Sequence, residues 1–259
     1  MPDMMAEQVL RMNEQLDYEA LQAPMSLIMD RSTGPEGYQA LAAALGDDPE
    51  GVKMLTCQLH CACRQYRSYL ELGIDEQIFF DTMSCYTRFV TECLYYKGGY
   101  QFDRGWWTWR QLSLSVFRLE HLEFELKQDG SVFIHIPSMT DLSAEAVDVS
   151  LKAAAAFIRQ YFPDYDQSNF CCRSWMLSPT LGELLEPRSR ILAFMRRFEI
   201  REVDAENQDY VSWLFRRLPG MSVDTFPEDT SLQRNVKAYL RKGGKIGTAF
   251  GVLIGRREL

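Results

Sequence analysis

The sequence predicts a protein of two parts, in which a helical N-terminal region is followed by an α/β region whose mixed sheet is flanked by helices. Three observations support this α+β or α/β fold class. Apolar residues recur at three- and four-residue steps through the first hundred positions, which is typical of amphipathic helices. Residues 116–137 alternate apolar and polar side chains around Asp129-Gly130, which predicts a β-hairpin. An alanine-rich segment, 144–161, then leads to a further strand, which predicts a βαβ crossover.

The helices of the N-terminal region are predicted from the spacing of their apolar residues. A long helix spans 52–69, and a second helix spans 78–94. Asp75 is suited to cap the second helix, and Gly98-Gly99 is suited to end it. The tryptophan-rich segment 106–112 follows. In a net acidic chain, its three tryptophans are expected to pack in the core or between domains rather than to stack on nucleic-acid bases.

The first strand of the sheet is predicted over 116–126 and the second over 131–138. Successive side chains of a strand point to opposite faces. The apolar face carries Leu122, Phe124 and Leu126, and the polar face carries His121, Glu123 and Glu125. A two-residue turn at Asp129-Gly130 places Phe124 opposite His135, so His135 is expected on the aromatic face. The crossover strand, 170–177, is expected to run parallel to the second strand.

The remaining C-terminal elements follow from turn residues and short apolar runs. They are helices at 179–185 and 187–197, strands at 198–204 and 210–215, a helix between Thr230 and Gly243, and a closing strand at 245–255. Gly247, Ala249, Gly251 and Gly255 share one face of the closing strand. Such a face allows a ligand or another backbone to approach closely, and a tightly packed helix is the alternative.

Composition excludes several classes of protein. The formal net charge of −8 argues against a nucleic acid or an anionic membrane as partner, because phosphate contacts need a basic surface. No apolar run reaches the roughly 20 residues that a membrane-spanning helix needs. The first residues lack the basic start and apolar core of a signal peptide. Seven cysteines, an odd number, indicate reduced thiols and a cytoplasmic protein. The oligomeric state stays open.

Four segments together carry a family resemblance: FDRGWWTWRQLSLSVFRLEHLEFEL, VFIHIPS, CCRSWMLSP and EDTSLQR. In this order and spacing, the chain resembles a family of bacterial acyltransferase-like proteins from about residue 36 onward. The resemblance implies a helical N-terminal domain, 1–111, and a GNAT-like (N-acetyltransferase-fold) C-terminal domain, 112–259. It also implies an acyl-coenzyme A co-substrate, with acetyl-CoA as the first expectation, and a small-molecule acceptor.

Two positions depart from the family pattern. Relatives tend to have a glycine after the FRL segment, where this chain has Glu120. The usual Gln/Arg-x-x-Gly-x-Gly/Ala loop is replaced by SMTDLSAEA, residues 138–146, which contains neither glycine nor arginine. Helix N-termini bind phosphate through unpaired N–H groups, and hydroxyls in this loop can add donors. The candidate cofactor-binding residues are Ile136, Ser138, Thr140 and Ser143. The alternative is a well-capped helix, with Ser143 as the cap and nearby acidic residues that complement the dipole.

Candidate catalytic residues lie on the central strands. Glu123 is a carboxylate of the kind that GNAT enzymes use to deprotonate the acceptor, with Glu125 behind it; a solvated strand edge is the alternative. His135 is a second candidate base, and a hydrogen-bonded core histidine is its alternative. Cys172 or Ser174 could protonate the leaving thiolate; a buried structural cysteine is the alternative for the first. A covalent cysteine mechanism would need a histidine nearby, which the sequence does not show.

Cys57, His60, Cys61 and Cys63 are spaced like metal ligands, but all fall on one predicted helix. One helix cannot surround a tetrahedral zinc ion, so no metal site is predicted.

The predicted reaction is the transfer of an acyl group from acyl-CoA to the amine of an unidentified small acceptor. The amine attacks the thioester directly, and backbone N–H groups between diverging strands stabilise the oxyanion. A non-catalytic GNAT-fold ligand-binding or interaction protein is the alternative.

Overall fold

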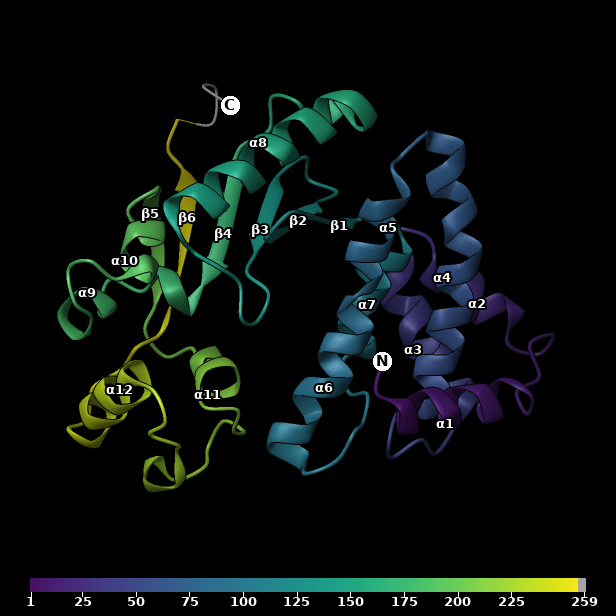
Figure 1. Ribbon diagram of the computed structural model, residues 1–259, viewed down its shortest axis with the longest axis horizontal. Coiled ribbons are helices and arrows are strands. Elements are labelled where there is room, and N and C mark those ends of the chain that lie inside the picture. The colour runs from purple at the N-terminus through teal and green to yellow at the C-terminus, as the bar shows by residue number, and fades with distance from the viewer. Residues whose placement is uncertain (256–259) are drawn as a thin grey trace. The chain divides into compact units, whose positions relative to one another are not determined.

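The computed structural model describes residues 1–255 and divides into two compact units, Met1–Leu119 and Glu120–Leu259 (Figure 1). The predicted domain boundary at residue 112 stays a prediction. The strands form a six-stranded mixed sheet in the order β1-β2-β3-β4-β6-β5, which confirms the predicted fold class.

The first unit is built from helices. They are α1 Asp3–Asn13, α2 Gln22–Ile28, α3 Gly34–Leu45, α4 Val52–Leu72, α5 Glu76–Met83, α6 Cys85–Lys97 and α7 Gly105–Leu112, and β1, Val116–Leu119, follows them. Their apolar faces form one core that includes Met25, Ile28, Leu41 and Leu55, each nearly or fully buried. Burial of these faces is the main stabilising term for the unit.

The predicted helix over 78–94 is two helices, α5 and α6, which meet at Ser84. The Ser84 hydroxyl donates to the Asp81 carbonyl at 2.6 Å, a local bond of the kind that competes with a continuous helix. The predicted cap is confirmed, since the Asp75 side chain accepts from the Gln77 N–H at 2.7 Å. Gly98 ends α6 with φ +74°, a conformation that glycine adopts readily.

The predicted strand over 116–126 is interrupted, so β1 ends at Leu119 and β2 spans Leu122–Leu126. Glu120 has φ +60°, the left-handed conformation that favours glycine. The tight turn therefore falls at the position where the family resemblance leads us to expect glycine. Alternation alone could not reveal it, because a glutamate carries no turn signal.

The register of the β2–β3 hairpin differs by one residue from the prediction. The loop has three residues instead of two: the Lys127 N–H donates to the Ser131 carbonyl at 2.9 Å, and Gly130 has φ +84°. In β3, Val132–His135, the residue opposite Glu123 is His135. A one-residue shift moves every side chain to the other face, so the expectation that His135 lies on the aromatic face is wrong.

The crossover is confirmed. Helix α8, Ala144–Tyr161, connects β3 to the parallel strand β4, Phe170–Ser174. The α8 face that carries Leu151, Ala154 and Ile158 is buried, and α8 can be followed across the strands of the second unit in Figure 1.

The other elements of the second unit are α9 Leu181–Leu184, α10 Arg190–Met195, β5 Phe198–Asp204, α11 Asp209–Leu214, α12 Ser231–Arg241 and β6 Thr248–Leu253, with short 3₁₀ turns at Pro163–Tyr165, Trp175–Leu177 and Val223–Thr225. The predicted strand over 210–215 is wrong. Tyr210 and Val211 in α11 are buried together with Phe215, which directly follows the helix, and Asn207 accepts from the Asp209 N–H at its start. The Thr230 cap is confirmed as a capping box with Gln233.

Candidate functional site

The two central strands of the second unit separate after a short parallel ladder. β3 and β4 pair only at Val132 with Phe170 and at Phe133 with Cys171. Beyond these positions β4 continues to Ser174, where its partner is β6 on the other side. Figure 1 shows β3 and β4 as neighbouring strands of the sheet. Beyond the ladder, the edge of β3 that faces β4 no longer pairs with that strand.

Backbone alternation directs particular N–H groups to that side of β3. The Val132 N–H donates to the Asn169 carbonyl, just before β4, at 3.2 Å. Every second residue of a strand points its N–H the same way, so the pattern extends to Ile134 and then to Ile136. Ile136 follows the end of β3 and lies beyond the paired positions. Its N–H is therefore a candidate donor to a ligand carbonyl.

The loop between β3 and α8 contains the three predicted hydroxyls. Ser143 caps α8, its Oγ accepting from the Ala146 N–H at 3.3 Å. Thr140 Oγ1 donates to the His121 carbonyl at 3.2 Å. Ser138 lies in a tight turn closed by a bond from the Thr140 N–H to the Pro137 carbonyl. All three hydroxyls thus lie within one short loop at the start of α8.

Two arginines that are not among the residues predicted from the sequence reach the start of α8 from the α10 region. Arg190 Nη1 lies 2.8 Å from Asp141 Oδ1, and Arg197 donates to Asp148 Oδ1 and to the Ala144 carbonyl. Hydrogen bonds from Ser143, reinforced by the charge of Arg190, lower the pKa of Asp141. The Arg197 hydrogen bond lowers the pKa of Asp148 despite partial burial. The only sequence signal is an arginine cluster in an acidic chain, at 188, 190, 196 and 197.

The polar face of the hairpin brings Glu123, Glu125 and His135 together. Glu123 and His135 are direct cross-strand partners, and His135 Nε2 lies 2.8 Å from Glu125 Oε2. Both glutamates are only 3% exposed, so a solvated strand edge does not describe them. The sequence predicts these residues as separate candidates, and the register places them in one cluster.

Glu125 is held at both carboxylate oxygens. Lys127 Nζ lies 2.9 Å from Oε1, and the same ammonium lies 5.4 Å from the centre of the Phe133 ring. Burial by itself raises the pKa of Glu125, but the hydrogen bonds and charges of His135 and Lys127 outweigh it and lower the pKa to about 2. Glu125 is therefore an anion at neutral pH and a weak proton acceptor.

Cys172 and Ser174 lie on the opposite face of the sheet from His135. The centres of the Phe170 and Phe124 rings lie 5.6 Å apart on the apolar face. Residues 172 and 174 lie on the same face as Phe170, because the side chains of a strand alternate between faces. Cys172 is 1% exposed, and burial raises the pKa of its thiol to about 12. Ser174 Oγ accepts from the Met176 N–H at 3.1 Å. The structure therefore does not pair Cys172 with His135 as a nucleophile and its base.

The cysteine-rich part of α4 is a packing element. Cys57 and Cys61 are buried, and burial raises the pKa of each thiol to about 12. Cys63 is exposed. The His60 ring stacks on the Tyr18 ring, with 4.2 Å between the two ring centres. Within residues 1–255, no group of three or more His, Cys, Asp or Glu side chains is arranged to hold a metal ion.

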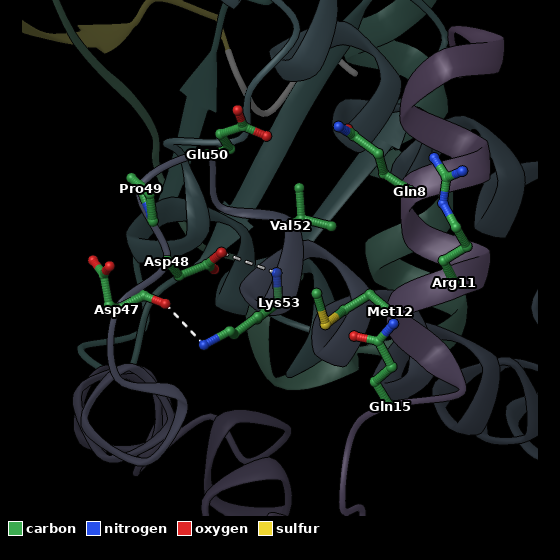
Figure 2. A pocket seen from close by; sticks show the side chains of 10 residues that line it. All are labelled: Gln8, Arg11, Met12, Gln15, Asp47, Asp48, Pro49, Glu50, Val52 and Lys53. Carbon is green, nitrogen blue, oxygen red and sulfur yellow. Dashed lines mark hydrogen bonds between the residues drawn. The ribbon is translucent and has the colours of Figure 1, made fainter.

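The first unit has a pocket of about 330 Å³ between α1 and the start of α4 (Figure 2). It is lined by Gln8, Arg11, Met12, Gln15, Asp47, Asp48, Pro49, Glu50, Val52 and Lys53. Asp48 accepts from the Lys53 and Met54 N–H groups, and Lys53 Nζ donates to the Leu45 and Asp47 carbonyls. These groups cap α4 and the end of α3, so their role is structural.

Comparison with known proteins finds a family domain in each of two parts of the chain. Residues 1–114 match the N-acyltransferase N-terminal domain, and residues 94–253 match the GNAT-like C-terminal domain. The chain belongs to this N-acyltransferase family. The match confirms the resemblance seen in the sequence. None of the curated proteins matches the chain.

Three solved structures share the fold over 98% of this chain and 84% of theirs, each with a TM-score of 0.82. One, 25% identical, is an acyltransferase in complex with decanoyl-CoA and teicoplanin. The second, 24% identical, is an acyltransferase in complex with CoA and 10C-teicoplanin. The third, also 24% identical, is an acyltransferase mutant in complex with octanoyl-CoA. Among residues 1–255, no helix of this N-acyltransferase family member is long and apolar enough to span a membrane.

Proposed function

We propose that this protein transfers an acyl group from acyl-CoA to the amine of a small-molecule acceptor by direct attack. The observation that carries the proposal is the separation of β3 and β4 beside the start of α8, in a chain of the N-acyltransferase family. Such a gap gives a thioester access to backbone donors. The acyl-CoA complexes of the similar structures support the choice of co-substrate.

The acyl-CoA is proposed to lie along the open side of β3. The Ile136 N–H would donate to the thioester carbonyl and stabilise the oxyanion that forms during attack. Ser138, Thr140 and Ser143 would offer hydroxyls to the phosphates of CoA. Arg190 and Arg197 would supply the positive charge that the loop itself lacks, because guanidinium groups bind phosphate well.

Proton transfer is proposed to involve the polar cluster on β2 and β3. His135 or Glu123 would accept the proton of the attacking amine. Cys172 or Ser174 would supply a proton to the leaving thiolate. The high pKa of Cys172 keeps this thiol protonated, which is compatible with a donor and incompatible with a nucleophile.

The acyl chain is proposed to range from acetyl to medium length. The family resemblance implies acetyl, whereas the similar structures contain octanoyl- and decanoyl-CoA. All seven cysteines have free thiols, which supports the proposal of a reducing, cytoplasmic location. A non-catalytic ligand-binding protein of the same fold is the second candidate, supported by the absence of glycine from the 138–146 loop.

The test combines binding with turnover. The melting temperature is measured with CoA, acetyl-CoA, octanoyl-CoA and decanoyl-CoA, because a ligand of the native state raises it. CoA release is then followed with a panel of small amines and matched alcohols. Stabilisation together with amine-dependent release supports the proposal. Stabilisation without release for any amine favours the binding protein, and no stabilisation at millimolar ligand contradicts both.

A further inference from the structure

We infer that Glu125 is a positioning residue that fixes the His135 ring, so that Nδ1 of His135 is the atom that takes the proton from the attacking amine. This inference rests on the proposed acyl transfer. It separates the roles of two buried glutamates on the same strand, Glu123 and Glu125, which are otherwise similar in burial and residue type.

The hairpin register sets the geometry. Glu123 lies directly opposite His135, and Glu125 lies opposite Phe133, one step further along the same face. Side chains at diagonal positions of an antiparallel pair are within reach of long residues. His135 uses this diagonal, since its Nε2 lies 2.8 Å from Glu125 Oε2, which is the distance of a charge-assisted hydrogen bond.

The carboxylate is itself immobilised. Lys127 holds the other oxygen at 2.9 Å, and the side chain of Glu125 is only 4% exposed. The low pKa of about 2 means that Glu125 remains charged, so it can accept hydrogen bonds and cannot donate them. An anionic partner at Nε2 requires that Nε2 carry the proton of a neutral His135 ring. The lone pair of that ring is then on Nδ1.

The chemical step balances with these groups. The amine nitrogen attacks the thioester carbonyl carbon, the N–C bond forms and the C–S bond breaks. The amine proton passes to His135 Nδ1, and the thiolate takes a proton from a neighbouring acid or from water. The products are an amide and the CoA thiol, and the imidazolium then returns its proton to solvent. Throughout, Glu125 stabilises the positive ring without exchanging a proton.

The first experiment needs no activity. The chain has three histidines, so long-range ¹H–¹⁵N spectra can be assigned with a His135→Gln variant. In the neutral form of the ring, wild-type His135 is expected as the Nε2–H tautomer. Glu125→Gln keeps this tautomer, because its amide oxygen still accepts, whereas Glu125→Ala gives a mixture. An Nδ1–H tautomer in the wild-type protein would overturn the inference, whether or not any variant folds.

The second experiment measures turnover. Glu125→Ala is expected to lower kcat by about 10²-fold, the lower end for general acid–base catalysis, and to leave KM for acyl-CoA within about twofold. Glu125→Gln is expected to recover part of the loss. Glu202→Gln is the matched control, because this carboxylate pairs with Arg173 and is 63% exposed. Unchanged kcat in a folded Glu125→Ala protein overturns the positioning role. A wild-type protein that releases no CoA with any amine instead refutes the proposed function, and the tautomer measurement still stands by itself.

Discussion

Glu123 and His135 are cross-strand partners on β2 and β3, although twelve positions separate them in the sequence. This pairing joins two candidate bases into one cluster. Two bases that serve the same proton do not contribute independently, so the pair can be tested as a unit.

We expect the effects of Glu123→Gln and His135→Gln on kcat/KM to be non-additive. If each single variant loses about 10²- to 10⁴-fold, the double variant should lose little more than the worse of the two. Steady-state kinetics on the four proteins of this cycle measure the coupling. Losses that multiply would show that the two side chains act in separate steps.

Removal of Glu125 should change the acid stability of the fold. The pKa of Glu125 is lowered from 4.5 to about 2, so its ion pairs stabilise the folded protein above about pH 4.5. This contribution is lost as the pH falls towards 2, and its full size is on the order of 3 kcal/mol. Wild type should therefore exceed Glu125→Gln in unfolding free energy at pH 6, and the difference should shrink in acid. A difference that stays constant down to pH 2.5 would contradict the assignment.

Loss of either arginine at the start of α8 should weaken acyl-CoA binding. We expect Arg197→Gln and Arg190→Gln each to raise KM for acyl-CoA by about tenfold, the value of one charged contact of ~1.4 kcal/mol, without lowering kcat. Arg190 is 68% exposed, so its loss should hardly change stability. Arg201→Gln is the control, since this exposed arginine pairs with Glu199 on β5. An equal increase in the control would indicate a general charge effect.

Alkylation should distinguish the cysteines. The thiolate is the reactive form, so Cys172, whose pKa is about 12, should resist iodoacetamide at pH 8 in the native protein. Cys63 is exposed and should be modified first. Peptide mass spectrometry over time gives the order. Modification of Cys172 as fast as Cys63 would show that its surroundings open readily.

Two glycines of the first unit should differ in their tolerance of alanine. Both have positive φ, but a Cβ at Gly51 would lie 1.8 Å from the Phe102 carbonyl oxygen, whereas Gly46 has no atom within 4 Å of that position. Gly46→Ala should cost about 1 kcal/mol from backbone strain, and Gly51→Ala at least twice that. Urea unfolding measures both. Equal costs would mean that the loop around residue 102 moves aside.

Local patterns predicted most elements because their causes are local. The bounds of α8 and the caps at Asp75, Ser143 and Thr230 follow from side chains that bond to the adjacent backbone. The failure at 210–215 has the opposite cause. A short, mostly apolar segment such as 210–215 fits either a strand or a helix turn, and only its packing in the second unit selects α11.

The sequence by itself determined the helical first part, the hairpin with its parallel crossover and the family, since periodicity, capping and turn residues act within a few positions of each other. Only the tertiary structure decided which chemical groups meet. One extra residue in the loop at Gly130 sets the register that joins His135 to Glu125. Folding of the α10 region brings Arg190 to Asp141, 49 positions away, and no local rule encodes a contact at that separation.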